Sequence, residues 1–139
     1  MVRVAGADAA TYLQGQVSQD VDALRPGDVA WSLVLDPTGK FVASFRLHRL
    51  ADDEFLLDTE LVSVEPLVAR LQRFRLRSAV TIDEEPGWRM LSVRGDDRID
   101  GDLPADAVRV TVGWPGFAGT DVLGPALALP AGLEVDDDA

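Results

Sequence analysis

The chain has 139 residues, 47% of them hydrophobic, and its 24 acidic against 13 basic residues give a formal net charge of −11. A chain of this length buries about 68–70% of its unfolded surface, enough for a core. The absence of cysteine excludes disulfides, zinc–thiolate sites and thiol nucleophiles, and the negative charge makes nucleic acid an unexpected partner.

The first stretch of the chain predicts a strand followed by helical segments. Residues Met1–Val4 predict a short strand, and Asp8–Gln14 has helical spacing. After Gly15, the stretch Gln16–Leu24 predicts a second short helix with Val17, Val21 and Leu24 inward. The sequence Arg-Pro-Gly-Asp at 25–28 is a turn signal.

A β-hairpin follows this turn. Its first strand has period-two alternation over Val29–Leu35. The Asp-Pro-Thr-Gly-Lys sequence at 36–40 favours a turn, because proline presets φ and glycine accepts a positive φ. Strict alternation over Phe41–Leu50 predicts an outer face with Ser44, Arg46 and His48. The residues predicted to be buried on the other face are Phe41, Ala43, Phe45 and Leu47.

An amphipathic helix follows a third strand at Glu54–Asp58. Ser63 is the predicted N-cap, and Pro66 is expected in the first turn, where its missing N–H costs little. Apolar residues repeat at i, i+3, i+4, i+7 and i+10, which indicates one buried face. They are Val64, Leu67, Val68, Leu71 and Phe74.

The remaining sequence predicts strands and a tail. The predicted strands are Ser78–Asp83, Trp88–Arg94, Ala107–Gly113 and Gly119–Gly124. Strands grouped in hairpins, with helices between the groups, predict an α+β fold with a largely antiparallel sheet. We expect one domain over residues 1–124 and a flexible, acidic tail over 125–139.

Targeting and ligand motifs are lacking. No apolar run approaches the roughly 18 residues of a membrane span, and residues 1–8 lack a signal-peptide core, so we expect a cytoplasmic protein with no membrane partner. Gly113, Gly116 and Gly119 do not have dinucleotide-motif spacing. His48, the only histidine, has no nucleophile marked beside it. We therefore predict no catalytic and no metal-binding residues.

Three collinear stretches within residues 4–94 carry a family resemblance. Residues 6–21 contain Gly-Ala-Asp-Ala and then Tyr-Leu-Gln-Gly-Gln-Val-Ser-Gln-Asp-Val. Residues 36–49 join Asp-Pro-Thr-Gly-Lys to Phe-Arg-Leu-His-Arg, and residues 71–82 contain Leu-Gln-Arg-Phe, Leu-Arg-Ser and Val-Thr-Ile. In this order they resemble the signatures of YgfZ-type folate-binding proteins, relatives of the glycine-cleavage aminomethyltransferases, or T-proteins.

The resemblance implies a tetrahydrofolate-binding α+β fold of ferredoxin-like halves, with this chain as the amino-terminal part. It implies a non-catalytic module that binds tetrahydrofolate or a derivative and helps to maintain iron–sulfur proteins. Signature positions suggest four ligand contacts. Gln16 and Asp20 offer hydrogen bonds to a pterin edge, and Lys40 and Arg46 offer charge for a carboxylate. The alternative for Gln16 and Asp20 is that they cap or bridge local helices.

Three arginines near the end of the predicted helix have two interpretations. Arg70, Arg73 and Arg77 are spaced i, i+3 and i+7 and could hold the glutamate tail of a folate. Cations are also favoured at a helix carboxyl terminus by the helix dipole alone. Both interpretations stay open at this point.

Two departures from the catalytic relatives bear on activity. Aligned through Gly39, the paired aspartates of those transferases fall near Ala43 and Ser44, and the downstream motif K-G-C-Y-x-G-Q-E is absent. We therefore expect no aminomethyltransferase activity. The alternatives are a fragment of a tetrahydrofolate-dependent aminomethyltransferase and a vestigial protein-binding scaffold.

The resemblance also bears on association. A half-fold leaves a sheet face or edge that can template pairing, so we expect a homodimer or a partner chain to cover it. The alternative is that the strands predicted within 108–124 fold back and seal that surface.

Overall fold

The computed structural model describes residues 1–94, 103–111, 116, 118–125 and 127. The chain divides into two compact units, Met1–Pro86 and Gly87–Ala139. The sequence did not predict this boundary, which lies between the predicted strands Ser78–Asp83 and Trp88–Arg94. The division into a domain over 1–124 and a tail over 125–139 stays a prediction, because 126 and 128–139 lie outside the described residues.

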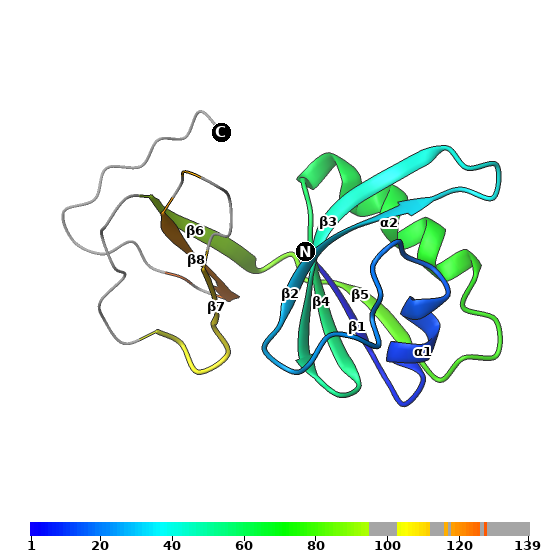
Figure 1. Ribbon diagram of the computed structural model, residues 1–139, viewed down its shortest axis with the longest axis horizontal. Coiled ribbons are helices and arrows are strands. Elements are labelled where there is room, and N and C mark those ends of the chain that lie inside the picture. The colour runs from blue at the N-terminus through cyan, green and yellow to red at the C-terminus, as the bar shows by residue number, and fades with distance from the viewer. Residues whose placement is uncertain (95–102, 112–115, 117, 126, 128–139) are drawn as a thin grey trace. The chain divides into compact units, whose positions relative to one another are not determined.

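The first unit packs two helices against one face of a five-stranded sheet (Figure 1). The sheet has the order β2-β3-β4-β1-β5, and every neighbouring pair is antiparallel. The predicted α+β class with an antiparallel sheet is therefore confirmed. The elements are β1 (Val2–Ala5), α1 (Ala9–Gln14), β2 (Val29–Leu35), β3 (Phe41–Ala51), β4 (Glu54–Asp58), α2 (Leu61–Arg73) and β5 (Thr81–Glu84).

The alternation of β3 is interrupted by a β-bulge at its start. Phe41 is 62% exposed, so its predicted burial is wrong. The register with β2 shifts so that Val34 faces Ala43 whereas Leu35 faces Phe41. The extra residue, Val42, packs partly against the core, and a bulge of this kind re-aims the residues beside it. The other residues predicted on the buried face, Ala43, Phe45 and Leu47, are fully buried.

The helix predicted over residues 16–24 does not form. Gln14 Oε1 accepts hydrogen bonds from the backbone N–H groups of Val21 (2.6 Å) and Asp22 (3.2 Å). Ser18 exchanges hydrogen bonds with Leu33 of β2, at 3.0 and 3.1 Å. Polar side chains that bond to the backbone in this way compete with helix formation. The predicted inward residues are still partly or fully buried: Val17, Val21 and Leu24.

Helix α2 begins earlier than predicted. Its N-cap is Glu60, not Ser63, so Pro66 is the sixth helical residue and does not lie in the first turn. The proline ring removes a hydrogen bond to the carbonyl of Val62. Three residues of the predicted stripe are buried: Val64, Leu67 and Leu71. Neither this helix nor any other in the described residues is long and apolar enough to cross a membrane.

The second unit contains an antiparallel sheet with the order β6-β8-β7. Its strands are β6 (Trp88–Arg94), β7 (Val108–Thr111) and β8 (Gly119–Pro125). The first was predicted with its bounds, the third ends one residue later than predicted, and residues 112 and 113 of the predicted second strand lie outside the described residues. Asp121 is buried and accepts hydrogen bonds from Ser92 (2.8 Å) and Arg94 (2.6 Å). An internal polar network of this kind satisfies a buried carboxylate.

Candidate functional site

The sheet of the first unit has a polar cluster on the face opposite its core. Strand pairing sets Trp31 of β2 opposite Arg46 of β3, and Arg46 opposite Asp58 of β4. His48 lies two residues further along β3 and therefore on the same face. We call Trp31, Arg46, His48 and Asp58 the outer-face cluster.

Asp58 is the centre of the outer-face cluster. Arg46 Nε donates a hydrogen bond to Asp58 Oδ2 at 2.6 Å, and His48 Nε2 donates to the same oxygen at 3.2 Å. The Arg46 and Asp58 side chains are each 12% exposed. Within the described residues both of these hydrogen bonds end on Oδ2 and none ends on Oδ1. Asp58 therefore keeps one oxygen that can accept hydrogen bonds from a ligand.

The neighbours of Asp58 stabilise its ionised form. Burial alone would raise the pKa of this carboxyl, but the hydrogen bond from His48 and the charge of Arg46 outweigh burial and lower the pKa. Asp58 is consequently an ionised carboxylate at neutral pH. It acts as a hydrogen-bond acceptor there, not as an acid.

His48 has one buried nitrogen without a partner. The side chain is 2% exposed, and Nδ1 makes no hydrogen bond within the described part of the chain. Because a carboxylate only accepts, His48 Nε2 carries the proton shared with Asp58. Nδ1 is left without a partner among the described residues. An unpaired buried polar atom costs about 1–3 kcal/mol, so a hydrogen-bonding partner that reached it would be favoured.

Trp31 supplies an aromatic surface on the same face as Asp58, with Arg46 between the two. Its side chain is 64% exposed although it lies within a strand. The Arg46 guanidinium carbon lies 6.0 Å from the centroid of the indole ring, within reach of a cation–π interaction. An exposed indole and a fixed carboxylate on one face suit a planar heteroaromatic ligand that carries N–H groups.

Arg46 alone of the four predicted contacts is part of this cluster. Gln16 Oε1 accepts a hydrogen bond from Arg70 Nη1 at 3.0 Å, which ties it to α2. Asp20 is exposed and accepts a hydrogen bond from Gln14 Nε2 at 3.3 Å. In the described residues no contact joins any two of Gln16, Asp20, Lys40 and Arg46.

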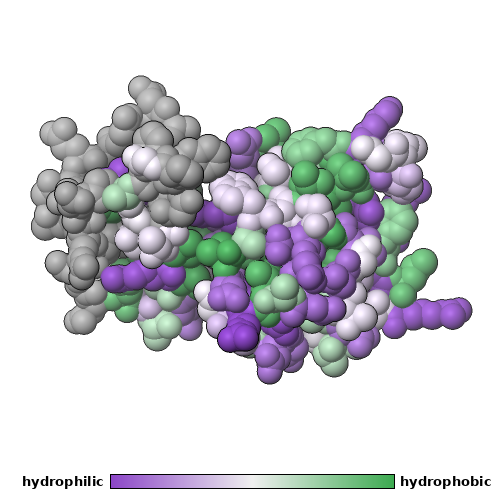
Figure 2. All heavy atoms as spheres, viewed as in Figure 1, coloured by the Kyte–Doolittle hydropathy of each residue, from purple (hydrophilic) through white to green (hydrophobic). Residues whose placement is uncertain are grey.

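Lys40 lies at the exposed end of the β2–β3 hairpin. Asp36 shapes this turn, because its Oδ1 accepts the backbone N–H groups of Thr38 (2.8 Å) and Lys40 (2.9 Å). The hydrogen bonds from the Thr38 hydroxyl and the Lys40 backbone lower the pKa of Asp36. Figure 2 shows hydrophilic side chains at this tip and hydrophobic ones along the strands behind it.

The three arginines near the end of α2 do not form one group. The guanidinium carbons of Arg70 and Arg73 lie 4.0 and 5.7 Å from the centroid of Phe74. Arg70 Nε also donates to the Leu35 carbonyl at 2.8 Å. Arg77 lies beyond the last helical residue, in a turn of its own. The contacts of Arg70 are therefore structural.

No sequence motif marks Trp31 or Asp58 as a site residue. The signal that contained Asp58 was the strand Glu54–Asp58, predicted with its correct bounds. The sequence did not show that Asp58 pairs with Arg46, because the register of β4 on β3 depends on an irregularity between Arg49 and Ala51. For metals, the residues that the structure describes contain no group of three or more histidine, aspartate or glutamate side chains placed to hold an ion.

The fold has a counterpart among solved structures. The crystal structure of glycine cleavage system aminomethyltransferase T from Bartonella henselae matches with a TM-score of 0.74, over 89% of this chain and 39% of that one. The identity is 17%, so this likeness concerns the fold alone. No family model matches the chain.

Sequence relatives are consistent with that fold. The tRNA-modifying protein YgfZ of Hamiltonella defensa is 32% identical over 97 residues, 69% of this chain and 28% of the relative. The mitochondrial homolog of iron-sulfur cluster assembly factor IBA57 from Mycosarcoma maydis is 31% identical over 96 residues, 60% of this chain and 24% of the relative. By sequence the chain belongs with the YgfZ-type proteins, and its fold matches that of a glycine-cleavage aminomethyltransferase.

The sequence match covers only part of each relative. An uncharacterized protein of Haemophilus influenzae is 31% identical over 96 residues, which are 69% of this chain and 34% of that protein. The chain thus spans between 24% and 34% of these three relatives. The activities of the whole relatives therefore do not transfer to it directly.

The positions near which the transferase aspartates were expected hold no carboxylate. Ala43 is fully buried in the core. Ser44 is exposed on the outer face, and its carbonyl accepts a hydrogen bond from the Thr59 hydroxyl at 2.7 Å. The carboxylate of the outer-face cluster is Asp58 instead. It pairs with Arg46, which lies two residues from Ser44 along β3.

Proposed function

We propose that this chain is a cytoplasmic, non-catalytic binding module for tetrahydrofolate or a derivative, and that it contributes to the maintenance of iron–sulfur proteins. The ligand is proposed from one observation: Asp58, whose Oδ1 accepts no hydrogen bond within the described residues, shares a sheet face with the exposed ring of Trp31. The link to iron–sulfur proteins is supported by the name of the Mycosarcoma maydis relative.

The chemistry of a pterin ring matches this pair of groups. A pterin presents a ring N–H and an exocyclic amino group side by side, and such an edge donates hydrogen bonds to a carboxylate. Asp58 is ionised and is held in place by Arg46, so its Oδ1 is ready to accept. The flat ring can stack on Trp31, since aromatic stacking is worth about 1–3 kcal/mol per base in comparable sites.

The remaining predicted contacts are part of the proposal. Lys40 would pair with a carboxylate of the ligand from the exposed end of the hairpin, and Gln16 and Asp20 would add hydrogen bonds. The contacts that Gln16 and Asp20 make with Arg70 and Gln14 fit the alternative that they bridge local structure. Alanine variants of these residues separate the two interpretations by ligand affinity.

Absence of transferase chemistry is proposed from the charge distribution. The transfer reaction of the catalytic relatives uses a carboxylate in the hairpin strand, where this chain has Ala43 and Ser44. Asp58 is committed to Arg46 and His48 and its pKa is lowered, so it is a poor proton carrier near neutral pH. An assay for tetrahydrofolate-dependent aminomethyl transfer with the purified chain is expected to show none.

Isothermal titration calorimetry with tetrahydrofolate and folinic acid tests the ligand. The Asp58→Asn variant is expected to bind at least about tenfold more weakly, because a hydrogen bond to a charged acceptor is worth about 1.5–3 kcal/mol. Asp52→Asn is the matched control, since that side chain is 89% exposed. Absence of saturable heat with the wild-type chain, or equal affinity in both variants, would overturn the assignment.

A further inference from the structure

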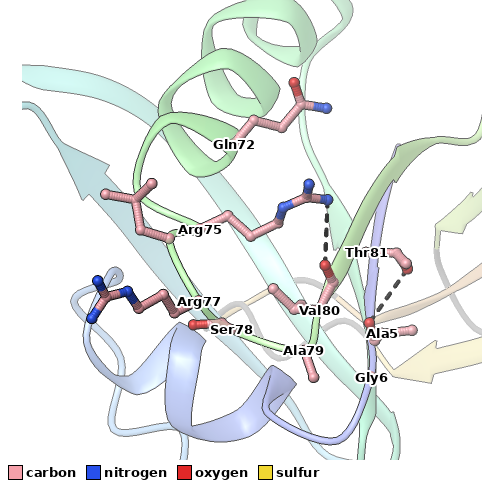
Figure 3. Close-up of a pocket in the computed structure, with 10 residues that line it drawn as sticks. Ala5, Gly6, Gln72, Arg75, Arg77, Ser78, Ala79, Val80 and Thr81 are labelled. Carbon is pink, nitrogen blue, oxygen red and sulfur yellow. Dashed lines mark hydrogen bonds between the residues drawn. The ribbon is translucent and has the colours of Figure 1, made fainter.

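A concave surface lies where α2 passes into β5. We propose that it binds an oxyanion-bearing ligand, one that carries a phosphate or a carboxylate group. The cavity has a volume of about 590 Å³, and the segment 72–81 provides most of its lining (Figure 3). This volume lies in the range of about 300–1,000 Å³ that is common for small-molecule sites. The inference is independent of the proposed folate site.

The charge of the lining favours an anion. Arg75 and Arg77 both line the cavity, and none of its lining residues is acidic. The whole chain has 24 acidic against 13 basic residues, so an acid-free lining with two arginines is opposite in sign to the net charge of the chain. Gln72, Ser78 and Thr81 add neutral hydrogen-bonding groups. A local positive field attracts anions even on a negatively charged protein.

The floor of the cavity is fixed by backbone contacts. The Ala79 N–H donates to Asp8 Oδ2 at 2.7 Å, and the Asp8 N–H donates to the Ala79 carbonyl at 3.3 Å. Gly6 has φ +135°, and a Cβ there would come within 2.3 Å of the Ala79 carbonyl oxygen. The chain therefore approaches this closely only because residue 6 is glycine. A preformed floor lowers the entropic cost of binding.

One N–H group of the Arg75 guanidinium is used in a hydrogen bond that orients the side chain. Its Nη1 donates to the Val80 carbonyl at 3.4 Å. Figure 3 shows the side chain extending from the end of α2 toward β5. A guanidinium has five N–H donors, arranged to meet an oxyanion in a bidentate manner. Arg75 therefore has donors left for a ligand.

Arg77 adopts a backbone conformation that a bulky residue rarely occupies. Its φ is +64°, and among the described non-glycine residues it is alone in having a positive φ. The turn is closed by a 3.0 Å hydrogen bond from the Ser78 N–H to the Arg75 carbonyl. Glycine would fit this position without strain. Strain of this kind is concentrated at functional sites, which indicates a role for the Arg77 side chain.

Titration of the full chain with inorganic phosphate, followed by NMR shifts of the backbone amides of residues 75–81, tests the site. Chloride replaces phosphate to hold ionic strength constant, and a parallel titration uses acetate. We expect saturable shifts of these amides with phosphate, acetate or both; the responding anion gives the ligand class. Shifts that stay linear with both anions would overturn the proposal.

Two variants and a control make the test specific. Arg75→Ala and Arg77→Gly are each expected to weaken anion binding by about tenfold, the loss of one charge-assisted contact. Arg77→Gly removes the backbone strain, so its melting temperature should not fall. Arg25→Ala, at an exposed arginine outside the cavity, should bind as the wild type does. Unchanged affinity in both cavity variants would refute the proposal.

Discussion

The two faces of β3 differ in what they contribute although their residues alternate along one strand. Phe45 and Leu47 point into a core that both helices cover. Arg46 and His48, between and beside them, meet Asp58 on the opposite face. A strand sorts side chains with a period of two, so a single segment supplies stability on one face and ligand chemistry on the other. Substitutions on the two faces should therefore have separable effects.

The largest effect on stability is expected from the core face. Phe45→Ala removes a fully buried ring and should lower the free energy of unfolding by about 3–5 kcal/mol. Urea unfolding followed by circular dichroism measures this change. A loss below about 1 kcal/mol would show that the core of the first unit does not depend on this face of β3.

A smaller effect is expected from the paired carboxylate of the outer face. Asp58→Asn should cost about 2 kcal/mol at pH 7, because Arg46 and His48 lose a charged acceptor. The folded pKa of Asp58 is lowered, so its contribution is present above the unfolded pKa, about 3.9, and is lost as pH falls through the folded value. The difference between variant and wild type should therefore shrink below about pH 4.

Unfolding measured at pH 7 and at pH 3 tests this linkage. Asp52→Asn, whose side chain is 89% exposed, should change stability by less than about 0.5 kcal/mol at either pH. A difference for Asp58→Asn that grew at low pH would contradict the sign derived from its lowered pKa.

The sequence alone was enough for the elements whose signals are local. The stripe of α2 follows from its periodicity, and the strand predicted over Glu54–Asp58 is also found. The face of Phe41 was missed because a bulge depends on how two strands meet, not on either strand alone. The helix predicted over 16–24 was wrong because Gln14 and Ser18 bond to backbone groups that a helix would use.

The candidate site was predictable in part. The period-two pattern of the strand is sufficient to place Arg46 and His48 together on the outer face. Asp58 joins them only through the register between β3 and β4, which contains an irregularity. Trp31 was assigned to a strand face, but its exposure depends on β2 turning Ser32 and Val34 toward the core instead. Long-range register, not residue type, was the missing information.

The smallest effect on stability is expected from Lys40→Ala, and this variant should still weaken folate binding. Its side chain is exposed at the hairpin tip, so Lys40→Ala should change the free energy of unfolding by less than about 0.5 kcal/mol. If Lys40 pairs with a ligand carboxylate, the same variant should weaken folate binding by about two- to fivefold, and less at high salt. Calorimetry at two salt concentrations distinguishes this from no contact.

The central claim is that the outer face binds a folate through Trp31 and Asp58, and calorimetry of two aromatic variants tests it most directly. Trp31 and Phe41 are 64% and 62% exposed, so Trp31→Ala and Phe41→Ala should both leave the fold intact. We predict saturable tetrahydrofolate binding by the wild type and by Phe41→Ala, and a loss of about tenfold or more in Trp31→Ala. Equal affinities of the two variants, or no binding by the wild type, would contradict the claim.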